Sequence, residues 1–146
     1  MTPTEIAKLQ SQTYRHGETV WSESAVALAL AAPGSVARYS SAGFAIGRIA
    51  GDEVELLSIA VDPSQQRLGE GSNLLQQFVE AALEAGATSI VLEVSEANVG
   101  AVTFYAKKGF ETVGRRKKYY RSGALYLDAI VMRKHLDPAS SDTKTC

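Results

Sequence analysis

Apolar and polar positions alternate along this chain with two periods, one typical of helices and one typical of strands. In the first third of the chain the pattern predicts two short helices followed by three strands. Ser22 is placed to cap the second helix, and Gly51-Asp52 forms a turn before the third strand. The expected helices cover residues 3–14 and 22–32, and the expected strands cover residues 35–40, 43–50 and 53–61.

The rest of the chain alternates between the two periods. After Gly69, apolar side chains recur three and four positions apart as far as Gly86, which predicts a long helix with one face against a sheet. The order of elements predicts an α/β (α+β) fold class, a mixed central sheet of about six to seven strands with helices on both faces. The remaining elements are expected to be a strand at 88–95, a helix from Asn98 to Gly109, and strands at 110–119 and 125–134 joined by the turn Arg121-Ser122-Gly123.

Length and charge narrow the possible functions. A chain of 146 residues fits one domain, and we expect residues 1–136 to form it and the polar residues 137–146 to be a disordered tail. The net charge of −1 gives no general electrostatic reason to bind nucleic acid or a membrane surface. No apolar stretch approaches the ~20 residues of a membrane span, and the N-terminus shows no signal-peptide pattern, so we expect a cytoplasmic protein.

The chain offers few residues for metal binding or covalent catalysis. Its one cysteine is Cys146, the last residue, which makes a poor nucleophile and has no partner for a disulfide within the chain. His16 and His135 lie far apart without further ligands at metal-binding spacing, so we expect no metal site. The basic run 115–118 is typical of a solvated strand face, although it could also attract a phosphate-rich ligand.

The segment 62–72 joins a predicted strand to a predicted helix through a glycine-bearing loop. The first amides of a helix have no partner within the helix, so glycines at 69 and 71 would let them approach a diphosphate closely. The loop is not a Walker motif, because Ser72-Asn73 rather than Lys-Ser or Lys-Thr follows the last glycine. It is not a dinucleotide fingerprint either, because position 74 is leucine.

The pattern Gln66-x-x-Gly69-x-Gly71 resembles the acyl-coenzyme A signature of the GNAT acetyltransferase superfamily. Further motifs in register with it, across roughly residues 18–134, resemble the RimI-type ribosomal-protein-alanine N-acetyltransferase group within that superfamily. These motifs are Trp21-Ser22-Glu23, Ile59-Ala60-Val61-Asp62-Pro63, Leu92-Glu93-Val94, Asn98, Tyr105, Gly109-Phe110, Tyr119-Tyr120 and Asp128-Ala129-Ile130-Val131-Met132.

The resemblance implies a GNAT fold and acetyl-CoA as the acetyl donor. It implies that two adjacent strands separate after the position of Val61 and that the main chain there polarises the thioester carbonyl. Glu93 would be the general base, through water, and Tyr105 the general acid. The residues expected to contact the donor are Ile59, Ala60, Val61, Gln66, Arg67, Leu68, Gly69, Glu70, Gly71, Ser72, Asn98 and Tyr105. Those expected at the peptide entrance are Trp21, Tyr119, Tyr120 and Asp128.

The chain departs from the family pattern at three positions. The family usually has a basic residue at the position of Ser72, a hydrophobic or small one at Glu70, and Asn or Gly at Lys118.

Each candidate site residue also has a purely structural interpretation. Glu93 could be a solvated strand charge, Tyr105 a core residue and Asn98 a helix cap, and the residues at the entrance could serve packing or loop anchoring.

The acceptor implied by the resemblance is a protein N-terminal α-amine, most specifically the N-terminal alanine of a small-subunit ribosomal protein. An α-amine titrates near 7.7 to 8.0 and a lysine near 10.4, so a lysine costs about 3.5 kcal/mol more to present as free base. The alternatives are a GNAT enzyme for small amines or protein lysines, and a catalytically silent acyl-CoA-binding module. We expect a monomer or weak dimer with no direct nucleic-acid or membrane contact.

Overall fold

The computed structural model describes residues 1–15, 17–66 and 68–137, so Arg67 and most of the expected tail lie outside the described residues. The described residues form four helices, a short 3-10 helix and one sheet. The helices are α1 (Pro3–Thr13), α2 (Glu23–Ala31), α3 (Glu70–Glu84) and α4 (Val99–Lys107), with the 3-10 helix at Pro63–Gln65. The strands are β1 (Ser35–Tyr39), β2 (Gly43–Ala50), β3 (Glu53–Val61), β4 (Ser89–Ser95), β5 (Glu111–Ser122) and β6 (Leu125–His135).

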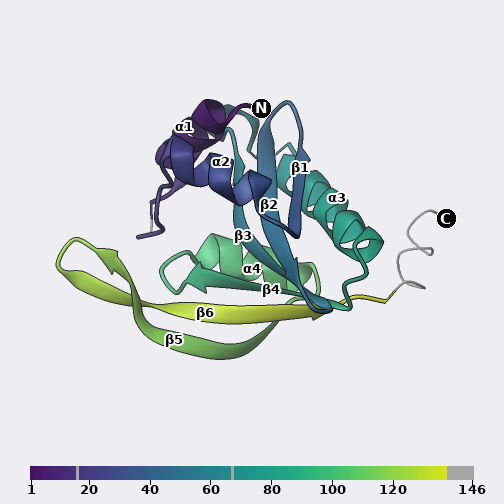
Figure 1. The fold of residues 1–146 in the computed structure, drawn as a ribbon. Coiled ribbons are helices and arrows are strands. Elements are labelled where there is room, and N and C mark those ends of the chain that lie inside the picture. The colour runs from purple at the N-terminus through teal and green to yellow at the C-terminus, as the bar shows by residue number, and fades with distance from the viewer. Residues whose placement is uncertain (16, 67, 138–146) are drawn as a thin grey trace.

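The sheet has six strands in the order β1-β2-β3-β4-β6-β5. The β3–β4 pair is parallel and the other pairs are antiparallel, so the predicted mixed sheet is confirmed with six strands. Figure 1 shows the consequence for the shape: β1 to β3 stand at one end of the sheet, while β5 and β6 form a long hairpin at the other end.

Helices cover both faces of the sheet, as the sequence pattern predicts. Leu75 and Phe78 of α3 pack with Tyr105 of α4 and with Val54 and Ile90 in the larger core cluster. The core cluster on the opposite face of the sheet is smaller, and its buried residues come from α1, α2, β2 and β3. They are Ile6, Leu9, Val26, Phe44, Ile46 and Ala60.

The two parallel strands are paired over only part of their length. Residues Glu53–Leu56 of β3 pair with Ser89–Leu92 of β4, and the pairing ends there. Beyond that point β4 pairs only with β6, and β3 pairs only with β2 as far as Val61. The separation therefore starts earlier than the expected position after Val61, because beyond Leu92 the β4 strand continues its pairing with β6 and no longer pairs with β3. It leaves the edge of β3 beyond Leu56 without a strand neighbour.

The β5 strand is longer than predicted and contains a bulge. The pairing register shifts between Arg116 and Tyr120, and Lys118 in between has a positive φ of 53°. The Lys118 amide donates to Oδ1 of Asp128 on β6 over 3.0 Å, which holds the bulge in place. Pairing then resumes from Tyr120 to the end of β5.

Candidate active site

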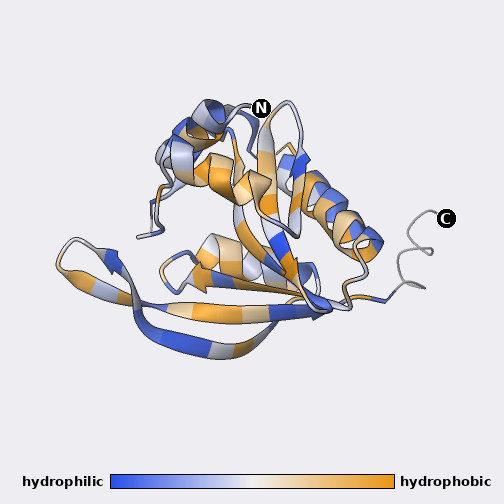
Figure 2. Ribbon diagram, viewed as in Figure 1, coloured by the Kyte–Doolittle hydropathy of each residue, from blue (hydrophilic) through white to orange (hydrophobic). Residues whose placement is uncertain are grey.

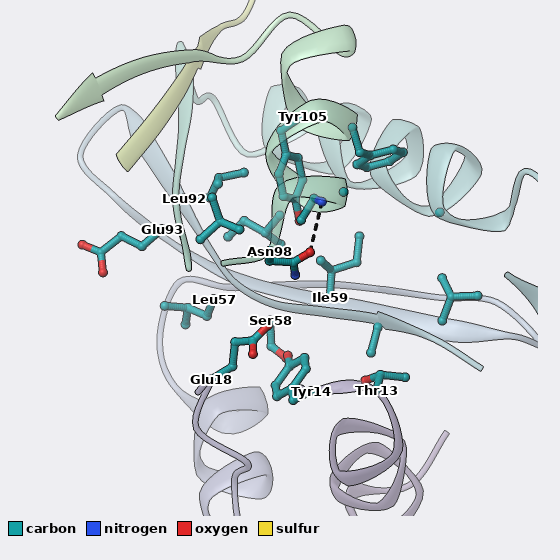
Figure 3. Close-up of a pocket in the computed structure, with 18 of the residues that line it drawn as sticks. Thr13, Tyr14, Glu18, Leu57, Ser58, Ile59, Leu92, Glu93, Asn98 and Tyr105 are labelled. Carbon is teal, nitrogen blue, oxygen red and sulfur yellow. Dashed lines mark hydrogen bonds between the residues drawn. The ribbon is translucent and has the colours of Figure 1, made fainter. Parts of the chain in front are cut away.

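A cavity of about 860 Å³ occupies the space opened by the separation of β3 and β4. It reaches from the N-terminal end of α3 to the segment between α1 and α2. Its walls come from the second half of β3, from Leu92, Glu93 and Val94 of β4, from α4, and from two tyrosines of the β5–β6 hairpin. Figure 3 shows labelled side chains of β3, β4, α4 and the segment around Tyr14 and Glu18 gathered around one space.

Most of the residues expected from the sequence line this cavity. Leu68 and Glu70 are not among its lining residues, and the Leu68 side chain is 69% exposed. Asp128 does not line it either. Arg67 lies outside the described residues. The expected residues that line the cavity are Trp21, Ile59, Ala60, Val61, Gln66, Gly69, Gly71, Ser72, Glu93, Asn98, Tyr105, Tyr119 and Tyr120.

The loop before α3 presents main-chain amides to the cavity. Gly69 is the N-cap residue with a left-handed φ of 81°, and no side chain caps the first turn. Glu70 is the acidic residue of this first turn. Asp62, at the start of the loop, accepts hydrogen bonds from the amide and hydroxyl of Ser64. Because the first amides of a helix carry partial positive charge and lack internal partners, this end of α3 can bind an anion.

The space in front of these amides is open. A Cβ added at Gly69 would meet no atom within 4 Å, and one at Gly71 would meet only the Phe104 ring at 3.8 Å. The loop is tied to the end of β3 by Gln66, whose Nε2 donates to the Val61 carbonyl over 3.1 Å. The loop is therefore held against the strand, and no other side chain fills the space beside its two glycines.

Tyr105 lies at the inner wall of the cavity and is 7% exposed. Its ring makes edge contacts with Phe104 and Phe110 at centroid distances of 5.3 and 5.5 Å. Its hydroxyl makes no hydrogen bond within the part of the chain that the structure describes. Burial, with smaller effects from Tyr14 and Tyr120, raises the pKa of Tyr105 well above its ordinary value. The side chain is thus a neutral phenol with a proton to donate.

Glu93 lines the same cavity from β4, but its carboxylate points away from Tyr105 (Figure 3). Its Oε1 lies 2.9 Å from Nη1 of Arg116 on β5, in an ion pair in which the Glu93 side chain is 18% exposed. The Tyr120 hydroxyl donates to the Glu93 main-chain carbonyl over 3.4 Å. Glu93 therefore lies at the cavity edge beside the hairpin, and its catalytic role stays a prediction.

Asn98 and Asp128 both have clear structural roles. Oδ1 of Asn98 accepts from the Ala101 amide over 3.1 Å, so Asn98 caps α4 while lining the cavity (Figure 3). Asp128 accepts from the Lys118 amide and pairs with Arg115 at 2.6 Å. These two contacts, the first being the larger, lower the pKa of Asp128. Asp128 therefore anchors the bulge that presents Tyr119 and Tyr120.

Sequence reasoning missed a hydrogen-bonded chain at the other end of the cavity. Gln10 is fully buried, and its Nε2 donates to Oγ of Ser58 over 2.9 Å while its Oε1 accepts from the Trp21 amide over 2.7 Å. Ser58 also bonds to the Tyr14 hydroxyl. The sequence did contain a sign of this chain of hydrogen bonds, because Gln10 follows Leu9 on the apolar face of the first helix. A polar side chain buried there needs a hydrogen-bond partner.

Two further findings concern what the described residues lack. Among residues 1–15, 17–66 and 68–137 no group of three or more His, Cys, Asp or Glu side chains could hold a metal ion. No helix in the same ranges is both long and apolar enough to cross a membrane.

Comparisons with known proteins agree with this geometry. The sequence is 37% identical over 91 residues to the ribosomal protein bS18-alanine N-acetyltransferase of Salmonella typhimurium, and the match covers 62% of each protein. The chain thus matches less than two thirds of that relative's length. It is 35% identical over 138 residues to the N-alpha-acetyltransferase RimI of Mycobacterium tuberculosis, covering 88% of this chain and 83% of that protein.

A solved structure gives the same result. The crystal structure of the ribosomal-protein-S18-alanine N-acetyltransferase from Escherichia coli superposes with a TM-score of 0.78 at 29% identity, covering 94% of this chain and 91% of that one. Residues 6–110 match the family model described as Acetyltransferase (GNAT) family. The resemblance seen in the glycine loop and its neighbouring motifs is therefore confirmed, and the chain belongs to the acetyltransferase (GNAT) family.

Proposed function

We propose that this protein transfers the acetyl group of acetyl-CoA to a protein N-terminal α-amine, most specifically the N-terminal alanine of a small-subunit ribosomal protein. The observation that carries the proposal is that one cavity joins the end of α3 without a side-chain cap to a wall containing carboxylates and phenols. The names of the relatives from Salmonella typhimurium and Mycobacterium tuberculosis support an N-terminal acceptor.

The residues at the α3 end fit the donor. The diphosphate of acetyl-CoA would accept hydrogen bonds from the first-turn amides of α3, with Gly69 and Gly71 leaving room for close approach. The open edge of β3 beyond Leu56 could then pair with the pantetheine amides as an added strand would. Main-chain amides near Val61 would polarise the thioester carbonyl.

Tyr105 and Glu93 suit the two proton transfers of a direct attack. The attacking amine must lose a proton and the departing thiolate must gain one. Tyr105, neutral and deep in the cavity, would protonate the sulfur. Glu93, at the cavity edge, would accept the amine proton through water, since its carboxylate points away from Tyr105.

The charged side chains that line the cavity favour an amine as the acetyl acceptor. The charged side chains among the described lining residues are Glu18, Glu55 and Glu93, all carboxylates. An α-amine costs about 3.5 kcal/mol less than a lysine to deprotonate at neutral pH, so one water-linked carboxylate is adequate for it. The same cavity could also serve small amines or protein lysines, which is the second candidate function.

A panel of acceptors tests the proposal. The protein is incubated with acetyl-CoA and with a peptide beginning with alanine, the same peptide beginning with serine, and an N-terminally blocked peptide with an internal lysine. Mass spectrometry then locates the acetyl group. We expect the alanine peptide to be modified fastest, at its α-amine. Turnover of only the lysine peptide or of a polyamine would contradict the proposal, and tight binding of acetyl-CoA without any turnover would indicate a silent binding module.

A further inference from the structure

The β5–β6 hairpin carries a row of basic side chains that the proposed function does not use. Seven of the fifteen Lys and Arg residues of the chain lie in the segment 111–135, although the net charge of the whole chain is −1. Five of the seven lie within residues 115–121, a stretch of strand at most about 20 Å long at ~3.3 Å per residue. Figure 2 shows much of β5 as hydrophilic. Positive charge is therefore concentrated on one element of the fold.

Two of these five cations are used within the molecule. Arg115 pairs with Asp128 at 2.6 Å, and Arg116 pairs with Glu93 at 2.9 Å. The other three are exposed, do not line the cavity, and make no ion pair with another residue in the described part of the chain. They are Lys117, Lys118 and Arg121.

Exposed tyrosines lie among these charges. Tyr119 is 48% exposed, and the Arg116 guanidinium lies over its ring at 4.2 Å from the centroid. Tyr126 is 57% exposed, and Arg121, its pairing partner on β5, has its guanidinium 5.6 Å from that ring. Cations and aromatic faces in one row suit single-stranded nucleic acid, because the charges meet phosphates while bases stack on the rings.

Protection of the sheet edge explains only part of this surface. β5 is an edge strand, and lysine on an edge strand discourages pairing with another chain. That role needs charge but no exposed apolar surface. Leu125, beside the turn of the hairpin, is nevertheless 67% exposed, next to the exposed ring of Tyr126. An apolar and aromatic surface left in water among cations indicates a binding partner.

The backbone of β5 favours a polyanion over an added peptide strand. A peptide that extends the sheet needs a continuous run of main-chain groups along the edge. The pairing register of β5 shifts twice along residues 112–120, and Lys118 within the second shift has a φ of 53°. A second copy of this chain would bring the same positive row against itself. Phosphates need no continuous edge, since each one is bound by individual side chains.

We propose that the exposed side chains of the hairpin form a binding surface for single-stranded nucleic acid. This inference differs from the expectation drawn from the net charge, which averages the hairpin with the more acidic rest of the chain. It goes beyond the proposed function and does not depend on it, because all of these residues except Tyr119 lie outside the lining of the cavity. The residues of the surface are Lys117, Lys118, Tyr119, Arg121 and Tyr126.

The test measures binding of the full chain, without acetyl-CoA, to labelled RNA and DNA oligonucleotides of the same mixed sequence, each about 12 nucleotides long. Fluorescence anisotropy gives the Kd over a series of salt concentrations. We expect a Kd of about 1 to 100 μM for at least one oligonucleotide, the usual range for sequence-independent contacts. A plot of log Kd against log salt should have a slope of ~2, since each of three phosphate contacts contributes ~0.7 on a single strand.

Two triple variants with the same loss of charge locate the contacts. Lys117→Gln/Lys118→Gln/Arg121→Gln should weaken binding by ~10-fold or more and lower the slope by ~2. The matched control removes two lysines and one arginine from exposed positions on α1, β2 and α4, none of which lines the cavity, and should weaken binding by less than ~2-fold. The control substitutions are Lys8→Gln, Arg48→Gln and Lys107→Gln.

A second pair of variants tests stacking. Tyr126→Ala should weaken binding by ~5-fold or more, because a base loses its stacking partner. Tyr39→Ala on β1, where the ring is 40% exposed and outside the cavity, is the control and should leave the Kd unchanged. Thermal melting of every variant checks that the fold is intact.

Three outcomes would overturn the proposal. The first is the absence of saturable binding to either oligonucleotide below ~1 mM protein. The second is an equal loss of binding in the two triple variants, which would mean that only net charge matters. The third is binding through the hairpin residues to a polyglutamate peptide or to anionic lipid vesicles but to neither oligonucleotide. The acetylation assay with peptides is separate, so its failure would contradict only the proposed function.

Discussion

Tyr105 owes its protonation state to the side chains around it. Two aromatic rings and the sheet bury its ring, and its hydroxyl reaches the cavity at the same time. A buried phenol favours its neutral form because the phenolate would lose its solvation. The core interpretation and the catalytic interpretation of this residue are therefore compatible, since the same burial that packs the ring also keeps the proton on the oxygen.

The first prediction concerns this hydroxyl. Tyr105→Phe keeps the ring contacts and removes the proton donor, so kcat should fall by ~10²-fold, the usual scale for a general acid. The KM for acetyl-CoA should change by less than about 2-fold, because the ring still packs as before. Steady-state kinetics checks this, with Tyr39→Phe on β1, 40% exposed and outside the cavity, as the control. An unchanged kcat in Tyr105→Phe would remove the assignment.

The pH dependence follows from the raised pKa of Tyr105. A general acid must be protonated, and a pKa above the ordinary value of about 10 keeps it protonated over a wider alkaline range. We therefore expect kcat to show no fall between about pH 8 and pH 10 that depends on Tyr105. The measurement is the pH profile of kcat at saturating substrates. A decline in this range that disappears in Tyr105→Phe would show that the phenol ionises too early for this role.

At the scale of elements, α3 and the strand before it make the donor site. The glycine loop lets β3 run directly into the first turn of α3, and the early separation of β4 opens the strand edge beside it. Two left-handed glycines flank this helix, Gly69 before it and Gly86 after it. Each would place an added Cβ in open space.

These two glycines provide a matched pair of variants. Gly69→Ala and Gly86→Ala should each cost about 1 to 2 kcal/mol of stability, because alanine is strained in the left-handed region. Only Gly69→Ala should also weaken the affinity for CoA, by ~10-fold or more, since its Cβ and the resulting backbone shift lie at the first-turn amides. Calorimetric titration with CoA checks this. Equal affinities in the two variants would mean that the diphosphate binds elsewhere.

Local sequence patterns predicted the helices and strands well. They predicted less well the point at which β3 and β4 separate. Ser22, Asn98 and Gly86 marked helix ends that the structure confirms, because caps and left-handed glycines act over a few residues. The point at which β3 and β4 separate depends on pairing between distant segments, so it was misplaced. The bulge at Lys118 was missed for the same reason, since Asp128 on the next strand sustains it.

The site was predictable where a motif marked it and not where tertiary contacts made it. Gly69, Gly71 and Tyr105 stand in recognisable spacings and line the cavity as expected. Tyr14 and Glu18 belong to no such spacing, because the bonds of Gln10 bring their segment to β3. Only the buried position of Gln10 on an apolar helix face hinted at that connection.

On the scale of the whole molecule, charge is unevenly divided. The segment 111–135, which makes the β5–β6 hairpin, carries seven basic and two acidic side chains, whereas the rest of the chain carries eight basic and fourteen acidic ones. Much of β5 is accordingly hydrophilic in Figure 2. Ion pairs join the two regions, among them Glu53 with Arg133 at 2.8 Å and Glu93 with Arg116 at 2.9 Å.

These contacts predict how stability depends on pH. Hydrogen bonds from Arg133 and Ser89 lower the pKa of Glu53, and the Lys118 amide and Arg115 lower that of Asp128. A carboxyl whose pKa is lower in the folded state stabilises the fold above its unfolded pKa of about 4, and this contribution is lost as the pH falls through the folded value.

We therefore expect the melting temperature to drop progressively as the pH falls from about 5 to about 2.5. Differential scanning calorimetry across this range provides the measurement. The slope should be smaller in Asp128→Asn, which has no carboxyl to protonate. A melting temperature that stays constant or rises over this range would contradict the assigned contacts.

The central claim is that the uncapped end of α3 and the open edge of β3 together hold the donor. Amide NMR during a titration with CoA tests it most directly, since each main-chain N–H reports its own hydrogen bonding. The account predicts the largest shift changes at the amides of residues 69–72 and 57–61, with the C-terminal end of α3 unchanged. Saturable binding of CoA that left both sets of amides unperturbed would contradict it.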